Sequence, residues 1–443
     1  MKIEKILIAN RGEIALRAIR TIKEMGKQAI AVYSLADKDA LYLQHADASI
    51  CIGEAKSSES YLSIPAIISA AEISGCDAIF PGYGFLSENQ TFVEVCKHHN
   101  IKFIGPSVDC MVLMSDKSKA KEVMKKAGVP VILGSEGALA DVEEAKKLAE
   151  QIGLPVIVKA SAGGGGRGMR VVEKMEDLEK SFLAAESEAL NAFGDGTLYM
   201  EKYIKNPRHI EVQVIGDSFG NVVHIGERDC SMQRRHQKLI EESPAIALDE
   251  KTRARLLEVA VKATKFIGYE NAGTFEFLLD ADKNFYFMEM NTRLQVEHCV
   301  SEMVSGIDII EWMIRVAEGE KLFDQSKIVL KGHSIECRIT AEDPVKFIPS
   351  PGKITKYIVP GGRNVRMDSH AYQGYVVPSH YDSMIGKLVV WGETRERAIK
   401  KMKQALSELQ IEGIKTVRDF HLNMMDNEDF IQNKFDTNYL SRY

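Results

Sequence analysis

The sequence predicts an α/β protein with more than one domain, and three observations support this prediction. A strand, a helix and a second strand follow one another at the N-terminus, over residues 5–9, 13–25 and 28–33. Two alternating apolar and polar runs predict a β-hairpin over residues 274–291. A chain of 443 residues is too long for one ordinary core and corresponds to about three domains.

The first segment, residues 1–115, is predicted to form a doubly wound parallel sheet. The predicted helix over residues 13–25 ends at Gly26. A strand–helix–strand unit of this kind joins two parallel strands. The turn Asn10-Arg11-Gly12 follows the first strand at its carboxyl end, where such sheets place their ligands.

Residues 116–330 are expected to form a second domain with a small α/β lid over 131–203. A helix with lysines at 117, 119 and 121 precedes the lid, and Gly128-Val129-Pro130 ends that helix.

A glycine-rich segment at 163–168 lies in the predicted lid, between a strand that contains Lys159 and a second strand at 169–172. Its glycines have the G-x-G-x-x-G spacing, but a dinucleotide-binding turn should open a helix, and Met169 excludes a Walker A loop. We interpret the segment as a glycine flap in a β-hairpin, whose backbone N–H groups can contact phosphates while Lys159 supplies a positive charge. A flexible surface turn is the alternative.

A dense polar and basic stretch runs from Glu227 to Lys238. On its own it is typical of a solvated charged surface. A nucleic-acid interface is a poorer interpretation, because Glu241 and Glu242 follow at once and the net charge of the chain is −6. Within the stretch, Cys230 is expected to be a small buried hydrophobe rather than a reactive thiol.

The hairpin at 274–291 carries the strongest functional signal. Folding it about its central turn brings Glu276 opposite Glu289, and Asn291 shares a face with Glu289 because side chains two apart in a strand point the same way. Two carboxylates and an amide oxygen are the ligands that hold Mg²⁺ beside phosphates. The hairpin therefore predicts an ATP site.

A cation, an amide and a carboxylate follow the hairpin at Arg293, Gln295 and Glu297. If this segment stays extended, all three side chains line one edge. The guanidinium can then bind a small planar oxyanion in a bidentate manner, and the carboxylate can remove its proton. A solvated polar strand face, stabilised by cross-strand charge pairs, is the alternative.

The last segment, residues 331–443, is strand-rich from His333 to Val390 and helical from Thr394 to Leu409.

Hydrophobic content of 45% and charged content of 27% are typical of a soluble globular protein. The seven cysteines include no C-x-x-C pair, which predicts reduced thiols and a cytoplasmic location. We expect neither a leader nor a membrane partner, because the N-terminus enters a strand directly and no apolar run could span a bilayer.

Together these segments resemble the ATP-grasp superfamily and, more closely, the biotin carboxylase family. The stretches 8–15, 81–89, 336–339 and 381–384 add to the resemblance, which covers essentially the whole chain in order and spacing. It implies an N-terminal biotin carboxylase domain (1–115), an ATP-grasp domain (116–330) and a C-terminal biotin carboxylase domain (331–443).

The resemblance also implies an ATP-dependent carbon–nitrogen ligase that uses two Mg²⁺ or Mn²⁺ ions. Glu276 and Glu289 should bridge one ion, and Glu289 with Asn291 should hold the second. The nucleotide should contact two phosphate-binding lysines, the flap glycines, a hinge and three further side chains, besides the two metal-binding glutamates: Lys117, Lys159, Gly165, Gly166, Glu201, Lys202, Tyr203, Ile204, His209, Gln233, His236, Glu276 and Glu289.

Four side chains are implied to carry the chemistry, and they are Lys238, Arg293, Glu297 and Arg338. Bicarbonate should bind against four side chains and one backbone group, namely Lys238, Arg293, Gln295, Arg338 and the backbone of Val296. Glu297 should act as the base that deprotonates bicarbonate, and carboxyphosphate should form. Tyr83, Gly84 and Arg338 should bind biotin, with Arg338 as the partner of its enolate oxygen.

The sequence departs from the family pattern at two positions. Phe80 stands where a histidine is frequent, and Cys299 stands where a proline is frequent. These departures put in doubt the details of the biotin pocket and of the exit from the bicarbonate loop.

The family resemblance implies the partners as well. No Ala-Met-Lys-Met biotinylation site is present, so we expect biotin on a separate carrier protein, with carboxyltransferase subunits and a homodimeric enzyme. The first half-reaction of acetyl-CoA carboxylase, which leads to malonyl-CoA and fatty acids, is the expected role. The alternatives are a pyruvate or propionyl-CoA carboxylase subunit, another ATP-grasp ligase, and a non-catalytic nucleotide-binding subunit.

Overall fold

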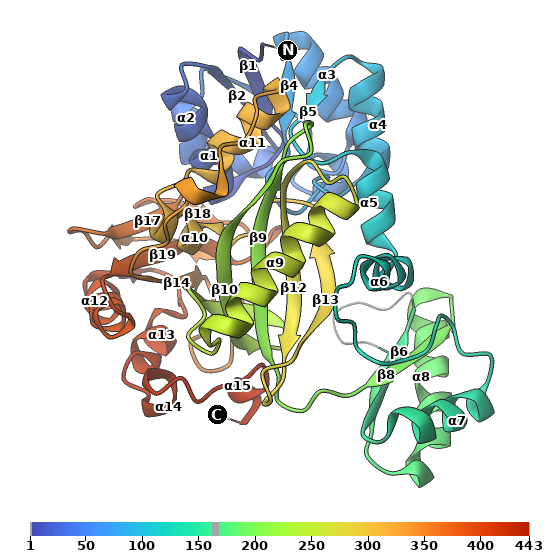
Figure 1. Cartoon of the computed structure of the whole chain (residues 1–443). Coiled ribbons are helices and arrows are strands. Elements are labelled where there is room, and N and C mark those ends of the chain that lie inside the picture. The colour runs from blue at the N-terminus through green and yellow to red at the C-terminus, as the bar shows by residue number, and fades with distance from the viewer. Residues whose placement is uncertain (1, 162–167, 443) are drawn as a thin grey trace.

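Five parallel strands form the sheet of the N-terminal part, in the order β3-β2-β1-β4-β5. The computed structural model describes residues 2–161 and 168–442, and this sheet lies at the top of the molecule in Figure 1. The predicted strand, helix and strand at the N-terminus are confirmed. The strands are β1 (Lys5–Ile8), β2 (Gln28–Tyr33), β3 (Ala48–Cys51), β4 (Ala78–Phe80) and β5 (Lys102–Phe103), and the helices are α1 (Gly12–Glu24), α2 (Leu41–His45), α3 (Ile64–Ser74), α4 (Gln90–His98) and α5 (Val108–Ser115).

Both faces of the middle of this sheet are buried, because successive residues of β1, β2 and β4 enter different apolar clusters. Ile6 and Ile8 pack with α1, whereas Leu7 packs with α3 and α4 on the other face. The doubly wound arrangement is thus confirmed.

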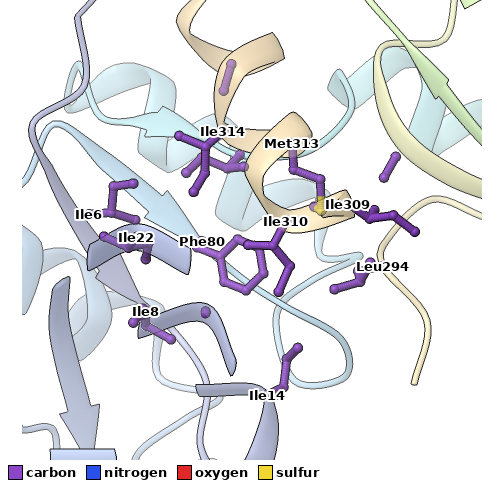
Figure 2. Close-up of a cluster of buried hydrophobic side chains, with 14 of the residues drawn as sticks. Ile6, Ile8, Ile14, Ile22, Phe80, Leu294, Ile309, Ile310, Met313 and Ile314 are labelled. Atoms are coloured by element: carbon purple, nitrogen blue, oxygen red, sulfur yellow. The ribbon is translucent and has the colours of Figure 1, made fainter. Parts of the chain in front are cut away.

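A helix from far along the chain completes the first of these clusters. The helix α11 (Ile309–Glu318) inserts Ile310, Met313 and Ile314 against the N-terminal sheet. Figure 2 shows these side chains beside Ile6, Ile22 and Phe80. The N-terminal core therefore depends on residues more than two hundred positions later in the sequence.

The lid is a separate three-stranded sheet in the order β7-β6-β8. Its helices and strands form their own apolar cluster, and Figure 1 shows the lid projecting to the lower right. The strands of the predicted glycine hairpin pair antiparallel, while the glycines at 163–166 lie outside the described residues. The elements are β6 (Val156–Ala160), β7 (Met169–Val172), β8 (Leu198–Lys202), α7 (Val142–Ile152) and α8 (Leu178–Phe193), and α6 (Lys117–Lys126) precedes them.

The central sheet has eight strands in the order β13-β12-β9-β10-β11-β14-β19-β17. The helix α9 (Glu250–Phe266) covers one of its faces (Figure 1). The predicted hairpin is confirmed, with Glu276 directly opposite Glu289. The strands are β9 (Arg208–Gly216), β10 (Val222–Arg234), β11 (Gln237–Ser243), β12 (Asn271–Leu279), β13 (Phe285–Asn291), β14 (His333–Thr340), β17 (Val365–Ser369) and β19 (Met384–Gly392).

The C-terminal part is built on this same sheet. An apolar cluster joins β14 and β19 to the C-terminal helices. None of the helices in the described ranges has the length and apolarity that crossing a bilayer requires. The remaining elements are α10 (His298–Ser305), α12 (Arg395–Glu408), α13 (Arg418–Met424), α14 (Glu428–Ile431), α15 (Tyr439–Arg442), β15 (Gly352–Lys353), β16 (Lys356–Ile358), β18 (Val376–Val377) and β20 (Gln410–Glu412).

Candidate active site

One cavity of about 1160 Å³ brings together the predicted site residues that the structure describes. It lies among the N-terminal sheet, the lid and the central sheet, and it is large enough for a nucleotide with a second substrate. Gly165 and Gly166 lie outside the described residues. The predicted residues that line it are Tyr83, Gly84, Lys117, Lys159, Glu201, Lys202, Tyr203, Ile204, His209, Gln233, His236, Lys238, Glu276, Glu289, Asn291, Arg293, Gln295, Val296, Glu297 and Arg338.

Lys238 is the centre of the charged part of the cavity. Its ammonium lies 2.7 Å from a carboxylate oxygen of Glu211, 3.0 Å from Glu276 and 2.5 Å from Glu297. Burial alone would lower the pKa of Lys238, but these three carboxylates raise it well above its ordinary value. Lys238 is therefore a fixed cation that joins the hairpin to the predicted base.

Glu297 is held as a carboxylate by cations on both of its oxygens. Lys238 contacts one oxygen, and Arg338 contacts the other at 2.9 Å. Burial opposes ionisation, yet Lys238, then Arg338, hold the pKa of Glu297 well below its usual range. A carboxylate in this position can accept a proton from a bound oxyanion acid once that acid displaces one of the cations.

The segment after the hairpin does not stay extended, so the prediction that depended on extension is wrong. The chain bends at Thr292 and turns at Val296, and α10 begins at His298. The turn nevertheless gathers the three predicted side chains: Gln295 donates to Glu276 at 2.7 Å, and Arg293 donates to Asn291 at 3.0 Å. The turn therefore brings Arg293, Gln295 and Glu297 close together, whereas an extended strand would have spaced these side chains along one edge.

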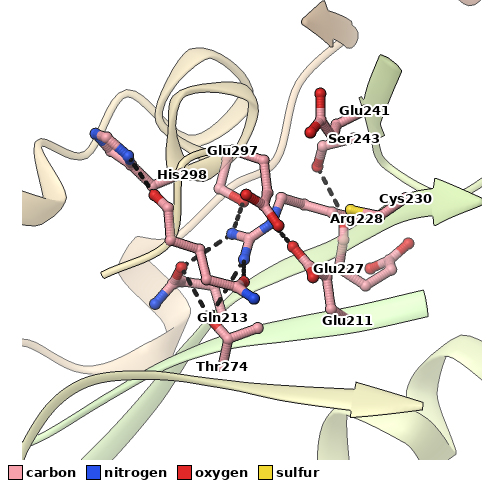
Figure 3. A network of polar contacts seen from close by, with 12 residues as sticks. Glu211, Gln213, Glu227, Arg228, Cys230, Glu241, Ser243, Thr274, Glu297 and His298 are labelled. Carbon is pink, nitrogen blue, oxygen red and sulfur yellow. Dashed lines mark hydrogen bonds and ion pairs between the residues drawn. The ribbon is translucent and has the colours of Figure 1, made fainter. Parts of the chain in front are cut away.

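Arg228 and Glu211 belong to the charged network beside the cavity, and nothing in the sequence singled them out. Arg228 is fully buried, and it pairs with Glu211 and donates to the side-chain oxygen of Gln295 at 2.7 Å. Figure 3 shows this guanidinium between Glu211 and the segment that carries Glu297. Burial opposes its charge, but Glu211 and then Glu297 raise the pKa of Arg228 above its ordinary value. Arg228 thus fixes the orientation of a carboxylate and an amide of the site.

Strand register explains how these residues meet. Arg228 lies directly opposite Glu211, Glu211 opposite Glu276, and Glu276 opposite Glu289. The four residues form one row across β10, β9, β12 and β13, and their side chains share one face of the sheet. The row thus places Glu276 and Glu289, the carboxylates of the predicted metal site, on the same sheet face as the buried guanidinium of Arg228.

The hairpin fits a divalent cation. Glu289 is 37% exposed in its side chain, and Lys117 lies 3.7 Å from it. Burial and then the like charge of Glu276 raise the pKa of Glu289. Two facing carboxylates and the amide oxygen of Asn291 are a hard oxygen set, and a cation between them would relieve this repulsion.

Lysines of the lid and of α6 meet at the other end of the cavity. Lys159 lies 2.6 Å from a carboxylate oxygen of Glu201, and Lys121 pairs with the second oxygen of the same side chain. Lys121 was identified in the sequence as a helix lysine but was given no role. Glu201 therefore holds two lysines together at this end of the cavity.

At the predicted biotin end, the hydroxyl of Tyr83 donates to Glu13, and Arg338 donates to Glu241 at 2.6 Å. Phe80 is fully buried in the core beneath and does not appear among the described residues that line the cavity. The phenylalanine at this position therefore packs in the core, while Tyr83 and Gly84 line the cavity.

The two cysteines of interest are both buried. Burial raises the pKa of Cys230 well above its ordinary value, as expected for a small buried hydrophobe. Cys299 is the second residue of α10 and lies 3.2 Å from a carboxylate oxygen of Asp368. At this position the thiol joins α10 to β17, a contact that proline could not make.

Three family models match the chain. They are the biotin carboxylase N-terminal domain over residues 2–111, the ATP-binding domain of the carbamoyl-phosphate synthase L chain over 116–325, and the biotin carboxylase C-terminal domain over 336–442. The matches follow the order of the N-terminal sheet, the nucleotide-binding part and the C-terminal part.

Full-length relatives agree with these models. A biotin carboxylase of Nostoc sp. is 55% identical over 99% of this chain and 99% of its own. The crystal structure of a Campylobacter jejuni biotin carboxylase complex with beta-gamma-ATP has 76% identity and a TM-score of 0.96, over 100% of this chain and 99% of that one.

A second similar structure is the biotin carboxylase domain of the 2-oxoglutarate carboxylase of Hydrogenobacter thermophilus, described as a dimer with MgADP, ADP and bicarbonate. It has 49% identity and a TM-score of 0.93, and covers 100% of this chain and 98% of that one. Similarity of this extent along the whole chain shows that this protein belongs to the biotin carboxylase family.

Proposed function

We propose that this enzyme carboxylates biotin on a separate carrier protein, using ATP and bicarbonate and forming ADP, phosphate and N1′-carboxybiotin. The observation that carries the proposal is the position of Lys238, which contacts both the metal-type carboxylate Glu276 and the base Glu297. This one cation links a nucleotide site to an acid–base site within a single cavity.

In the proposed first step, bicarbonate binds against Lys238, Arg293 and Gln295, with the backbone of Val296 and Arg338 completing the site. Glu297 takes its hydroxyl proton, a bicarbonate oxygen forms a bond to the γ-phosphorus, and the bond from that phosphorus to ADP breaks. Carboxyphosphate is the product. Because carboxyphosphate is labile in water, closure of the lid protects it before the second step.

The nucleotide is proposed to contact the residues named above, with Lys117 and Lys159 on its phosphates. Glu276, Glu289 and Asn291 would hold two Mg²⁺ or Mn²⁺ ions, which supply neutralisation of charge on the transferring phosphoryl group. Release of Glu201 from its two lysines accompanies phosphate binding, since the phosphates replace its negative charge.

In the proposed second step, carboxyphosphate releases CO₂ and phosphate, and the phosphate removes the proton from N1′ of biotin. The enolate then attacks CO₂ and forms the new carbon–nitrogen bond. Arg338 stabilises the enolate oxygen, because a fixed cation favours the charge that develops there. Tyr83 and Gly84 shape the binding site of the biotin ring.

The experiment that tests this function measures ADP release with Mg²⁺-ATP and bicarbonate, with and without free biotin, together with transfer of label from radioactive bicarbonate. Stimulation by biotin and labelled carboxybiotin are the expected results. Turnover that requires bicarbonate but ignores both biotin and a biotinylated carrier would identify another ATP-grasp ligase. Nucleotide binding without turnover under all substrate combinations would identify a non-catalytic subunit.

We further propose a homodimer in the cytoplasm that works with a carboxyltransferase using acetyl-CoA. The seven cysteines are free thiols, which suits a reducing compartment. The relative from Hydrogenobacter thermophilus belongs to a 2-oxoglutarate carboxylase, so the acceptor needs its own test. Mixing carboxylated carrier with purified acetyl-CoA, propionyl-CoA and pyruvate carboxyltransferases, and measuring the labelled product, identifies it.

A further inference from the structure

A buried lysine outside the cavity contacts several segments that line it. Lys387 is in β19, and its side chain is 0% exposed. The described residues that line the cavity do not include it. Its ammonium donates to the backbone carbonyl of Val296 at 2.8 Å and lies 3.1 Å from a carboxylate oxygen of Glu13.

The partners of Lys387 belong to different parts of the site. Val296 is in the proposed bicarbonate loop, and Glu13 is in the first turn of α1. The same Glu13 oxygen accepts the hydroxyl hydrogen bond of Tyr83, from the proposed biotin loop. One buried ammonium therefore fixes the bicarbonate loop directly and the biotin loop through one carboxylate.

Sheet register places this ammonium beside the proposed enolate partner. Lys387 lies directly opposite Arg338 in the pairing of β14 with β19. Directly opposed residues of an antiparallel pair share one face of the sheet, so the two cations lie on the same side. Arg338 reaches into the cavity, whereas Lys387 supports the loops behind it.

Stability alone gives a weak reason for this arrangement. Burying an ammonium carries a large desolvation penalty, and an apolar residue of similar volume often serves a core equally well or better. The contacts of Lys387 instead reach Val296 and Glu13, both of which line the cavity. The charge of Lys387 thus holds two residues of the cavity lining in position.

We propose that Lys387 is a positioning residue, which with Glu13 sets the distance between the bicarbonate loop and the biotin loop. The inference rests on the proposed function. It assigns a role to two residues that, in the described part of the chain, form no ion pair with the phosphate-binding lysines Lys117 and Lys159. The Lys387–Glu13 pair should therefore affect the two small substrates and spare the nucleotide.

The test compares Lys387→Met with Lys27→Met. Lys27 offers a matched control, because it also joins a glutamate, Glu318 at 2.7 Å, to a backbone carbonyl, that of Ile3 at 2.6 Å, in a region away from the cavity. Both variants lose an ammonium, an ion pair and a carbonyl hydrogen bond. Each is assayed as full-length enzyme, with the folded fraction determined by thermal melting and circular dichroism.

For Lys387→Met we expect apparent KM values for bicarbonate and for free biotin to rise at least about tenfold, because small misplacements of binding groups have effects of this size. The KM for ATP should stay within about twofold of the wild type. Lys27→Met should leave all three KM values unchanged. Equal KM values in the two variants, or a parallel rise for ATP, would overturn the proposal.

Glu13→Gln provides a second arm if Lys387→Met does not fold. This substitution keeps the size of the side chain and removes the charge that orients Lys387. We expect smaller rises in the same two KM values, and a double variant less impaired than the product of the single effects. Full additivity would overturn the proposal. Wild-type enzyme that makes no carboxybiotin would instead refute the proposed function, so the two failures are distinguishable.

Discussion

At the scale of single residues, Arg338 divides its charge between two carboxylates. It pairs with both Glu241 and Glu297, and Lys238 pairs with Glu297 as well. We predict that Arg338→Ala retains nucleotide binding but loses biotin carboxylation by about 100-fold or more, the usual effect of removing a group that stabilises developing charge. Nucleotide affinity from calorimetry and labelled carboxybiotin measure the two effects, and unchanged carboxylation would contradict the assigned role.

We predict that the free energy of unfolding depends on pH because of Glu241. Burial raises its pKa to about 7, although Arg338 opposes the shift. Since the ordinary value is 4.5, the folded protein binds more protons than the unfolded chain between pH 4.5 and 7, and the free energy of unfolding falls as pH rises through that range. This carboxyl should account for a loss of roughly 3 kcal/mol across the window.

The measurement is urea unfolding of the wild type and of Glu241→Gln at several pH values. Gln does not titrate, so the difference between the two unfolding free energies should change between pH 5 and 7 and level off above 8. A difference that is constant over this range would show that Glu241 titrates normally. Arg338 stays charged throughout, because Glu241, Glu297 and Glu336 raise its pKa against the effect of burial.

At the scale of elements, the β12–β13 hairpin holds two carboxylates in direct opposition. We predict opposite effects of Glu289→Gln on metal binding and on stability. Loss of one ligand should weaken Mn²⁺ binding in the presence of ADP at least tenfold, since even indirect partners of a metal have effects of 10- to 100-fold. Loss of the like-charge contact should stabilise the metal-free protein by roughly 0.2–1 kcal/mol.

Electron paramagnetic resonance of Mn²⁺ and thermal melting without metal check the two effects of Glu289→Gln. Glu122→Gln is a suitable control, because Glu122 is an exposed residue of α6 that pairs with Lys126. If Glu289→Gln binds Mn²⁺ as tightly as the wild type, the hairpin does not provide the metal site.

Elements were predictable from the sequence where a local pattern determines them. The first strands, α1 and the β12–β13 hairpin follow from apolar periodicity and turn residues, and the position of Glu276 opposite Glu289 follows from counting. The segment after Asn291 was ambiguous, because its alternating polar residues fit a strand as well as the turn that leads into α10. Sequence periodicity does not distinguish a strand from a turn whose polar side chains bind one another.

The missed residues have a different cause. Arg228 and Glu211 meet through the pairing of β9 with β10, and Lys387 meets Glu13 across almost the whole chain. Nothing local marks a buried charge, since each of these residues also suits a solvated surface. Register between distant strands, which tertiary packing sets, decides which charges are buried.

At the scale of the whole molecule, the central sheet crosses the expected boundary at residue 330. Strand β11 pairs with β14, and Glu241 lies opposite Glu336 in that pairing. The division into 1–115, 116–330 and 331–443 thus remains a prediction about function, while one sheet connects the last two parts. We predict that a fragment ending at residue 330 aggregates, because it exposes the edge of β11.

Hydrogen exchange of the full chain tests whether the central sheet on both sides of residue 330 is one unit. Peptides from β11, β14 and β19 should exchange with one common free energy of opening, because they belong to one cooperative unit. Peptides from the lid should open separately, since the lid has its own sheet and core. Independent opening of β11 and β14, together with a soluble and folded fragment, would contradict the prediction.

The packing of α11 against the N-terminal sheet has a consequence for synthesis on the ribosome. Residues 1–115 emerge first, but the cluster around Ile310 and Ile314 that covers them appears only after almost two hundred further residues. At about 5–20 residues per second, the interval is roughly 10–40 s. During that time the nascent chain presents an apolar face to the cell, so a chaperone such as a ribosome-bound holdase should associate with it until α11 arrives.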